Sequence, residues 1–327
     1  MRWKQSVVAC ILCVTPISVI ASPITQLVTF GDSLSDNGNA AIALGGTIPG
    51  NYAGNALTDG PLTTPATSGP FGLWIDQFAA KLGVADPAPF LASGTNFAVA
   101  SALTGHNPAF TGLPTVVPYT NDQIALYLLG HTASASDLYT FWAGANDINS
   151  AGNPITAADN IAGDIAALSA HGAKQFLWLN LPLLGDTPDG AASGQAAALN
   201  AASLAFDAEW AAEIAKLHAA GINVIGVNIE QLFVEIRNSP GTFGFTDVTD
   251  PAWCGAGGLA NCATNNPNDF LFWDGEHPTT AADALVADLA FKDVTAVPEP
   301  ASLALSLAAF SIVLVTSRLR RRWVHGR

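Results

Sequence analysis

A serine near the start of the chain and an aspartate–histidine pair near its end have the types and spacing needed for nucleophilic catalysis. Ser33 lies in the stretch FGDSLSDNGN at 30–39, and Asp274 precedes His277 by three residues in the stretch DGEHP. Ester hydrolysis by a serine needs a nucleophile, a base that takes its proton and an acid that orients the base. The two segments are about 240 residues apart, so the fold must bring them together.

His277 differs from the other histidines of the globular region because an acidic residue precedes it in a glycine-containing turn. There the Asp274 carboxylate can accept the Nδ1 proton of His277, which leaves Nε2 free to act on Ser33. We expect Glu276, which alternates with His277, to point into solvent. The histidines that fall at predicted helix C-termini, or in loops without a nearby acidic partner, are His171, His218, His106 and His131.

The oxyanion of the tetrahedral intermediate needs hydrogen-bond donors, and each is worth about 10²–10³ in rate. Asn146 follows a predicted strand and could offer its side-chain amide, although Asn-Asp is also a common turn pair. Backbone N–H groups of Ser33 and of the turn after residues 95–100 are further candidates. We expect Ser33 at the start of a helix, where the dipole stabilises negative charge. A structural alternative is that Ser33 is only an N-cap, with Asp36 completing a capping box.

Short apolar strands alternate with amphipathic helices along the chain. The helix pattern includes Trp74, Phe78 and Leu82 at helical spacing, and a second helix that we expect to begin at an N-cap Thr156 and to end before Gly172. This alternation predicts a parallel sheet covered on both faces, with functional sites at the carboxyl ends of the strands. The predicted strands are 24–30, 95–100, 138–142, 175–181 and 222–227.

Four segments resemble the motif blocks of the GDSL/SGNH hydrolases, in the same order along the chain: 30–39, 94–98, 144–147 and 274–277. A fifth stretch, 180–188, resembles the linker after the family's fourth strand. The resemblance covers about residues 24–292 and implies a flavodoxin-like three-layer α/β/α sandwich with a central five-stranded parallel sheet. It also implies hydrolysis of carboxylic esters without a metal or another cofactor. Carried over by position, the nucleophile is Ser33, the base His277, its orienting acid Asp274 and the oxyanion donors Ser33, Ser101 and Asn146.

One position departs from this family pattern. The family has an oxyanion-hole glycine five residues after the asparagine of its second block, and here that residue is Ser101. A main-chain N–H can come from Ser101 at negative φ, whereas a positive φ would cost about 1 kcal/mol or more. The side chain would also narrow the acyl pocket, so low activity or a small acyl group is one expected consequence.

Three functions follow from these residues. The first is an exported serine esterase or lipase that acts through an acyl-enzyme. The second is an acetylesterase acting on surface or matrix polysaccharide, and the third is a non-catalytic matrix protein that keeps the fold. The first function requires a working Ser33, whereas the third draws its support from the departure at Ser101.

The N-terminus predicts a secretory signal peptide over residues 1–21. Arg2 and Lys4 precede an apolar stretch at 7–20, and cleavage by signal peptidase is expected after Ala21. An uncleaved anchor is the alternative. The predicted hydrolase domain then spans 22–296.

The C-terminus, 297–327, resembles a PEP-CTERM sorting signal. Pro-Glu-Pro at 298–300 precedes an apolar run at 301–317, which is the short end of a membrane-spanning helix. The resemblance implies transient membrane anchoring, removal of the tail by an exosortase, and a destination at the surface or in the matrix of a Gram-negative bacterium. Arginines that would hold the end of the helix on the cytoplasmic side are Arg318, Arg320, Arg321 and Arg322.

The charge of the domain argues against one class of binding partner, and its two cysteines suggest a disulfide. Residues 22–296 hold five basic against 25 acidic side chains, a net charge of −20 that makes nucleic-acid binding unfavourable. Cys254 and Cys262 are expected to form a disulfide in an exported domain, with a metal-binding pair as the alternative.

Overall fold

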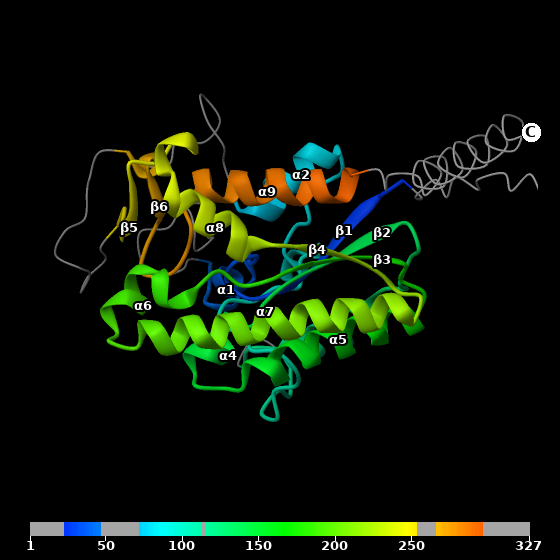
Figure 1. The fold of residues 1–327 in the computed structure, drawn as a ribbon. Coiled ribbons are helices and arrows are strands. Elements are labelled where there is room, and N and C mark those ends of the chain that lie inside the picture. Colours follow the sequence, from blue (N-terminus) through cyan, green and yellow to red (C-terminus); the bar gives the residue numbers. More distant parts are fainter. Residues whose placement is uncertain (1–22, 47–71, 113–115, 254–265, 297–327) are drawn as a thin grey trace, which may run out of the picture. The chain divides into compact units, whose positions relative to one another are not determined.

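The central sheet of the computed structural model has four strands that are parallel and run in the order β1-β2-β3-β4 (Figure 1). The structure describes residues 23–46, 72–112, 116–253 and 266–296. Within them β2 is buried along its whole length and β1 from its second residue on, as expected for a parallel sheet covered on both faces. The strands of the sheet are β1 (Gln26–Gly31), β2 (Asp137–Trp142), β3 (Gln175–Leu179) and β4 (Asn223–Val227).

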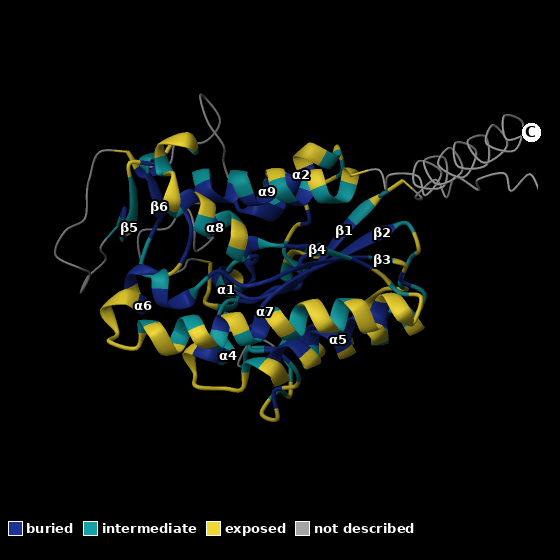
Figure 2. Ribbon diagram, in the orientation of Figure 1, coloured by how far each residue is buried: buried dark blue, intermediate teal, exposed yellow. Residues whose placement is uncertain are grey.

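Helices cover both faces of this sheet within the compact unit Pro23–Thr295. In Figure 1, α2, α8 and α9 lie on one side and α4, α5 and α7 on the other, and Figure 2 shows the buried strands between them. The α-helices are α1 (Asn39–Ala43), α2 (Trp74–Leu82), α3 (Thr120–Gly130), α4 (Ala145–Asn149), α5 (Pro154–Ala170), α6 (Pro188–Ala192), α7 (Ala196–Ala219), α8 (Ile229–Asn238) and α9 (Thr280–Thr295).

The prediction of five strands was wrong by one, because residues 95–100 do not form a regular strand. They lie beside β1 and make an isolated parallel bridge between Thr29 and Asn96. The backbone of Asn96 is otherwise bonded outside the sheet: its N–H donates to the carbonyl of Ala88, and its carbonyl accepts from the Asn39 side chain at the start of α1. The segment nevertheless stands where the second strand of a 2-1-3-4-5 sheet would stand.

The predicted start of α5 was also wrong. Its N-cap is Asn153, whose side chain accepts a hydrogen bond of 2.9 Å from the N–H of Ile155, and not Thr156. Pro154 occupies the first helical turn, where its missing N–H costs nothing, and this favours a helix that begins one residue after Asn153. The predicted end is confirmed, since Gly172 follows the helix with a φ of +112°.

A second, two-stranded sheet leads into the aspartate–histidine turn. It pairs β5 (Asp247–Pro251) with β6 (Phe270–Phe272) in parallel. Trp273 follows β6 and its N–H donates to the carbonyl of His277 at 2.8 Å, which closes the turn before α9. Strand β1 therefore positions Ser33, and the connection between β6 and α9 positions Asp274 and His277.

Several predictions fall on residues outside the described ranges. These are the signal peptide, the sorting signal with its membrane helix, and the Cys254–Cys262 disulfide. Among the helices in the described part of the chain, none has the length and apolar character to cross a membrane.

Candidate active site

Strand β1 carries Ser33 to the carboxyl edge of the sheet. Gly31 pairs with Trp142 at the end of β2, so the segments that follow both strands leave the sheet at the same edge. A Cβ at Gly31 would overlap the carbonyl oxygen of Trp142, which restricts this position to glycine. Ser33 lies in a tight turn, because the first helix, α1, begins only at Asn39. The expected placement of Ser33 at the start of a helix was therefore wrong.

Gln123, on α3, holds the backbone just before this turn. Its Oε1 accepts from the N–H of Gly31 at 2.9 Å, and its Nε2 donates to the carbonyl of Gly31 at 2.8 Å and to that of Pro118 at 3.1 Å. The Gln123 side chain is fully buried. Because an amide matches both a donor and an acceptor, this one side chain fixes the peptide two residues before Ser33.

Asp36 joins the serine turn to the neighbouring segment 95–100. Its carboxylate accepts backbone hydrogen bonds from Gly38, Asn39 and Ala40 at 2.6–3.0 Å, and another of 2.8 Å from Ala100. Burial raises the pKa of Asp36, and these four N–H donors oppose that shift. The Asp36 side chain therefore acts as the cap of α1, and it fixes the turn against the loop that precedes Ser101.

The structure brings the predicted serine, histidine and aspartate into a continuous hydrogen-bonded chain. Ser33 Oγ lies 2.8 Å from His277 Nε2, and His277 Nδ1 lies 2.8 Å from Asp274 Oδ2. Asp274 Oδ1 also accepts the backbone N–H groups of Glu276 and His277 at 2.9 and 2.8 Å. Asp274 is therefore fixed by the turn that carries the histidine, as the three-residue spacing predicts.

Asp274 and His277 shift each other's pKa. Burial lowers the pKa of His277, but the charge and hydrogen bond of Asp274, together with the charges of Glu276 and Asp32, outweigh burial and raise it to about 9. Burial acts to raise the pKa of Asp274, and the charge of His277 with its hydrogen bond holds it below its usual range. The pair thus favours an ionised carboxylate beside the imidazole, which is the arrangement that stabilises an imidazolium during catalysis.

Glu276 is exposed to solvent, as we expected, but its carboxylate also lies near His277. Its Oε2 accepts a hydrogen bond of 3.2 Å from Asn149 on α4, and its Oε1 lies 4.0 Å from His277 Nε2. The side chain is 44% exposed. Alternation along the chain predicts the exposure of Glu276 but not this approach to the histidine.

Asp32 is a second acid that the sequence analysis did not single out. Its side chain is buried beside Ser33, and its Oδ1 accepts from the N–H of Leu34 at 3.0 Å. The Oδ2 atom has no hydrogen-bond partner among the described residues. Burial raises the pKa of Asp32 to about 7, although the Leu34 N–H opposes this shift.

Of the proposed oxyanion donors Asn146 and Ser101, only Asn146 lies among the described residues that line the cavity over Ser33. Asn146 lines the same cavity as Ser33 and His277, and its Nδ2 donates to the carbonyl of Ala102 at 3.1 Å. This leaves the second N–H of the amide for another acceptor. Ser101 has a φ of +65° and is exposed, and it does not belong to the described residues that line the cavity. Its role as a donor stays a prediction.

The cavity over Ser33 has mainly apolar walls. Its volume is about 450 Å³, counting space open to solvent. An apolar cavity with a few converging polar groups is typical of a site for a small organic substrate. The described residues that line it are Asp32, Ser33, Leu34, Trp142, Ala145, Asn146, Pro182, Leu184, Phe233, Glu276, His277 and Pro278.

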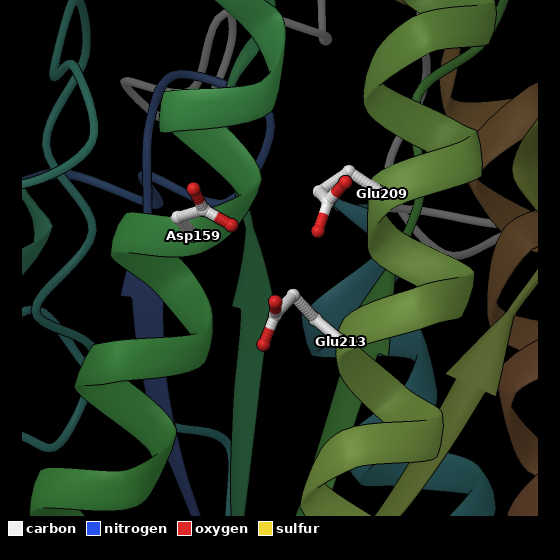
Figure 3. A group of neighbouring side chains, drawn as sticks. All are labelled: Asp159, Glu209 and Glu213. Atoms are coloured by element: carbon white, nitrogen blue, oxygen red, sulfur yellow. The ribbon is translucent and has the colours of Figure 1, made fainter.

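Three carboxylates elsewhere could be mistaken for a metal site. Asp159 on α5 lies near Glu209 and Glu213 on α7, with their carboxylates turned toward one another (Figure 3). Lys216 pairs with both glutamates and lies 3.1 Å from the Glu209 Oε1 atom. The cluster therefore already contains a cation of the chain itself, and its residues do not line the cavity over Ser33.

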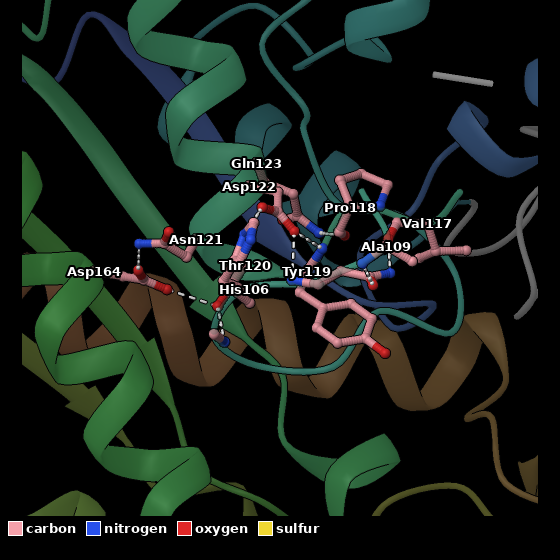
Figure 4. Close-up of polar contacts among 12 residues, drawn as sticks. His106, Ala109, Val117, Pro118, Tyr119, Thr120, Asn121, Asp122, Gln123 and Asp164 are labelled. Carbon is pink, nitrogen blue, oxygen red and sulfur yellow. Dashed lines mark hydrogen bonds and ion pairs between the residues drawn. The ribbon is translucent and has the colours of Figure 1, made fainter. Parts of the chain in front are cut away.

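His106 has an acidic partner that its sequence neighbours did not reveal. Its Nδ1 lies 2.5 Å from Asp122 Oδ1, and Asp122 Oδ2 accepts backbone N–H groups of Asn107 and Tyr119 (Figure 4). The His106 side chain is 62% exposed, and it is not among the described residues of the cavity. The pair is thus a loop contact that orders the start of α3.

The sequence that carries this geometry matches a known protein family. Residues 27–290 match the model of the GDSL-like lipase/acylhydrolase family. The chain belongs to this family. The match spans all elements that position Ser33, Asn146 and His277, and family membership supports a carboxylic ester hydrolase.

Relatives with curated names include several esterases. The chain is 27% identical to esterase EstA of Pseudomonas aeruginosa over 99% of its own length and 55% of the relative's. It is 25% identical to a GDSL esterase/lipase of Arabidopsis thaliana over 87% of its own length and 95% of the relative's. Of solved structures, Est24, a carbohydrate acetylesterase from Sinorhizobium meliloti, has a TM-score of 0.46 and 15% identity, covering 84% of this chain and 100% of its own. The chain spans about half the length of several curated relatives, EstA among them.

Proposed function

We propose that this protein is a serine esterase that hydrolyses carboxylic esters through an acyl-enzyme on Ser33. In the first step Ser33 Oγ attacks the ester carbonyl carbon while His277 Nε2 takes the hydroxyl proton. The tetrahedral intermediate then collapses, the C–O bond to the alcohol breaks, and the imidazolium returns its proton to the leaving oxygen. A water molecule repeats the sequence on the acyl-enzyme and releases the carboxylic acid.

The observation that carries the proposal is the unbroken chain from Ser33 through His277 to Asp274, with both contacts to the imidazole nitrogens at 2.8 Å. Geometry of this kind identifies a nucleophile, its base and the group that orients the base. The Ser33 N–H and the Asn146 amide would stabilise the oxyanion. The main-chain N–H of Ser101, a residue with a left-handed backbone, is a further proposed donor.

The cavity walls favour an acyl chain over a carbohydrate. Leu34, Leu184 and Phe233 present apolar surface beside Ser33, whereas a sugar would need more hydrogen-bonding side chains. Polysaccharide acetylesterase activity is therefore the less favoured alternative, and a non-catalytic matrix protein would have no use for the hydrogen-bonded triad.

The proposed cellular setting rests on the termini. Residues 1–21 would act as a signal peptide cleaved by signal peptidase, and 297–327 as a PEP-CTERM signal with a short membrane helix and an arginine-rich tail. Removal of the tail by an exosortase would release the domain 22–296 to the cell surface or matrix of a Gram-negative bacterium. A disulfide between Cys254 and Cys262 would suit that oxidising location.

Covalent labelling tests the proposal. The full-length chain is treated with a fluorophosphonate, and mass spectrometry locates the adduct. We expect the adduct on Ser33, its loss in Ser33→Ala, and at least a hundredfold slower labelling in His277→Ala. His171→Ala, which alters an exposed histidine at the C-terminus of α5, is the matched control and should label normally. A folded protein that is not labelled, or is labelled at another serine, would refute the proposed mechanism.

A further inference from the structure

Glu276 places a negative charge beside the atom that must hand a proton to the leaving alcohol. Its Oε1 lies 4.0 Å from His277 Nε2, and its other oxygen is held by Asn149 at 3.2 Å. Glu276 lines the same cavity as Ser33. The two carboxylate oxygens of Glu276 thus face His277 and Asn149, while the side chain is 44% exposed.

The position of the leaving group follows from the proposed function, on which this inference rests. Protonation of the leaving oxygen requires it to come within about 3 Å of His277 Nε2. A substituent two or three atoms beyond that oxygen then lies about 4–6 Å from the Glu276 carboxylate. The charge of Glu276 therefore acts on the alcohol half of the ester.

Asp274 already balances the charge that forms on the imidazole. Its carboxylate contacts Nδ1, so the imidazolium and Asp274 together are close to neutral during the reaction. Glu276 is thus an additional acid at the site, and Asp32, buried next to Ser33 in the chain, adds a further one when it is ionised.

Apart from His277 itself, the described lining of the cavity contains no basic side chain that offsets these acids. All five basic residues of 22–296 lie in the described ranges, because the segments 47–71, 113–115 and 254–265 contain neither lysine nor arginine. None of the five belongs to the described lining of the cavity. Three of them have acidic partners elsewhere: Lys81 with Asp288, Lys216 with Glu209 and Glu213, and Arg237 with Asp186.

We propose that the enzyme prefers esters whose alcohol carries a positive charge two or three atoms from the ester oxygen, and that Glu276 is the residue that sets this preference. The chemical class is the ester of a quaternary ammonium alcohol or an amino alcohol. Esters with an anionic alcohol are poor substrates for the same reason. At about 5 Å, and with Glu276 partly exposed, Coulomb attraction favours the cationic ester by about fivefold over a neutral one of the same shape.

A matched pair of substrates separates charge from shape. 2-(Trimethylammonio)ethyl butyrate and 3,3-dimethylbutyl butyrate differ in a nitrogen for a carbon, and 3-sulfopropyl butyrate provides the anionic alcohol. Release of butyric acid by the full-length chain is followed by pH-stat titration at pH 8. We expect kcat/KM to be about fivefold higher for the cationic than for the neutral ester, and lower still for the sulfonate.

Two further measurements assign the preference to Glu276. The variant Glu276→Gln should bring the cationic-to-neutral ratio close to one, whereas Glu235→Gln, the same charge change at an exposed residue of α8, should leave the ratio near five. Raising the salt concentration from 0.05 to about 0.5 M should lower the wild-type ratio, because screening weakens a charge effect and not a shape effect.

The outcomes distinguish this inference from the proposed function. Hydrolysis of the neutral ester with a wild-type ratio of one or below would overturn the inference and leave the esterase mechanism standing. A ratio that persists in Glu276→Gln would assign the preference to another group and would equally overturn it. Absence of turnover with every ester, together with unlabelled Ser33, would overturn the proposed function itself.

Discussion

Replacing Gln123 by methionine should both destabilise the fold and slow the enzyme, although Gln123 does not line the cavity. Methionine has nearly the same length and volume, so packing of α3 is largely kept. The change removes the two hydrogen bonds of 2.9 and 2.8 Å to the peptide groups of Gly31, and the bond of 3.1 Å to Pro118.

The expected decrease in the free energy of unfolding follows from the hydrogen bond that each backbone group loses. The Gly31 N–H is left buried without its partner, which costs about 1–3 kcal/mol. The Gly31 carbonyl keeps a second donor, the Val99 N–H at 3.2 Å, so its loss is smaller. Together with Pro118, the expected decrease in the free energy of unfolding is about 2–4 kcal/mol.

The kinetic effect arises because Gly31 fixes the chain two residues before Ser33. Small displacements of a nucleophile relative to its base slow the reaction strongly, and a misplacement near 1 Å can lower the rate about 10²-fold. We therefore expect kcat for a neutral ester to fall by about 10- to 100-fold in the molecules that remain folded, with a smaller change in KM.

Urea unfolding and ester hydrolysis, measured on the same preparations, test both effects. Gln231→Met is the matched control, since Gln231 is an exposed helical glutamine whose amide donates only to Glu235 among the described residues. It should change the free energy of unfolding by less than about 0.5 kcal/mol. If Gln123→Met behaves like this control in both assays, the role assigned to the Gln123–Gly31 contacts is incorrect.

Two further predictions concern the ionisation of the site and its strained turn. His277 must be neutral to accept a proton and its pKa is raised to about 9, so kcat/KM should increase with pH up to about pH 9; a limb near the ordinary value of 6.5 would contradict this. Because the folded state then holds that proton more tightly than the unfolded chain, this histidine's contribution to stability is full below pH 6.5 and is lost as pH rises through 9. Ser101→Gly should raise the free energy of unfolding by about 0.5–1 kcal/mol, since relief of a left-handed serine exceeds the added entropy of the unfolded chain. Ser101→Ala, which keeps the strain, should show no such gain in urea unfolding.

The residues of the triad could be predicted from sequence because their spacing is set by short-range chemistry. Asp274 and His277 lie in one turn, and Asp274 Oδ1 accepts the His277 N–H within that turn. The position of Ser33 at the carboxyl edge of the four-stranded sheet follows from the rule for parallel sheets, but the aspartate–histidine turn follows β6 of the separate two-stranded sheet. The distance that joins Ser33 to His277 is a property of the whole fold, and no local pattern contains it.

The errors arise where side chains replace regular backbone pairing. Residues 95–100 have the apolar pattern of a strand, but Asn39 and Asn96 draw the backbone into contacts with the serine turn. Hydrophobic periodicity carries no information about such amide contacts. The Asn153-Pro154 pair, by contrast, was a readable signal for the start of α5, since proline is favoured in the first turn.

Other side-chain contacts were missed because the two partners are distant in sequence. Gln123 lies 92 residues from Gly31, and His106 finds Asp122 across a loop. Glu276 is exposed as alternation predicts, but alternation does not predict that its carboxylate lies 4.0 Å from His277 Nε2. Asp32 is next to Ser33, yet its burial is a property of the whole fold.

The distance along the chain between the two halves of the site also sets when the protein can become active. His277 is made 244 residues after Ser33, which at about 5–20 residues per second is a delay of about 12–49 s. During that interval a nascent chain carries a serine without its base. Under the proposed mechanism ester hydrolysis requires the turn that carries His277 to have docked, so the onset of turnover after dilution from denaturant would time that step of folding.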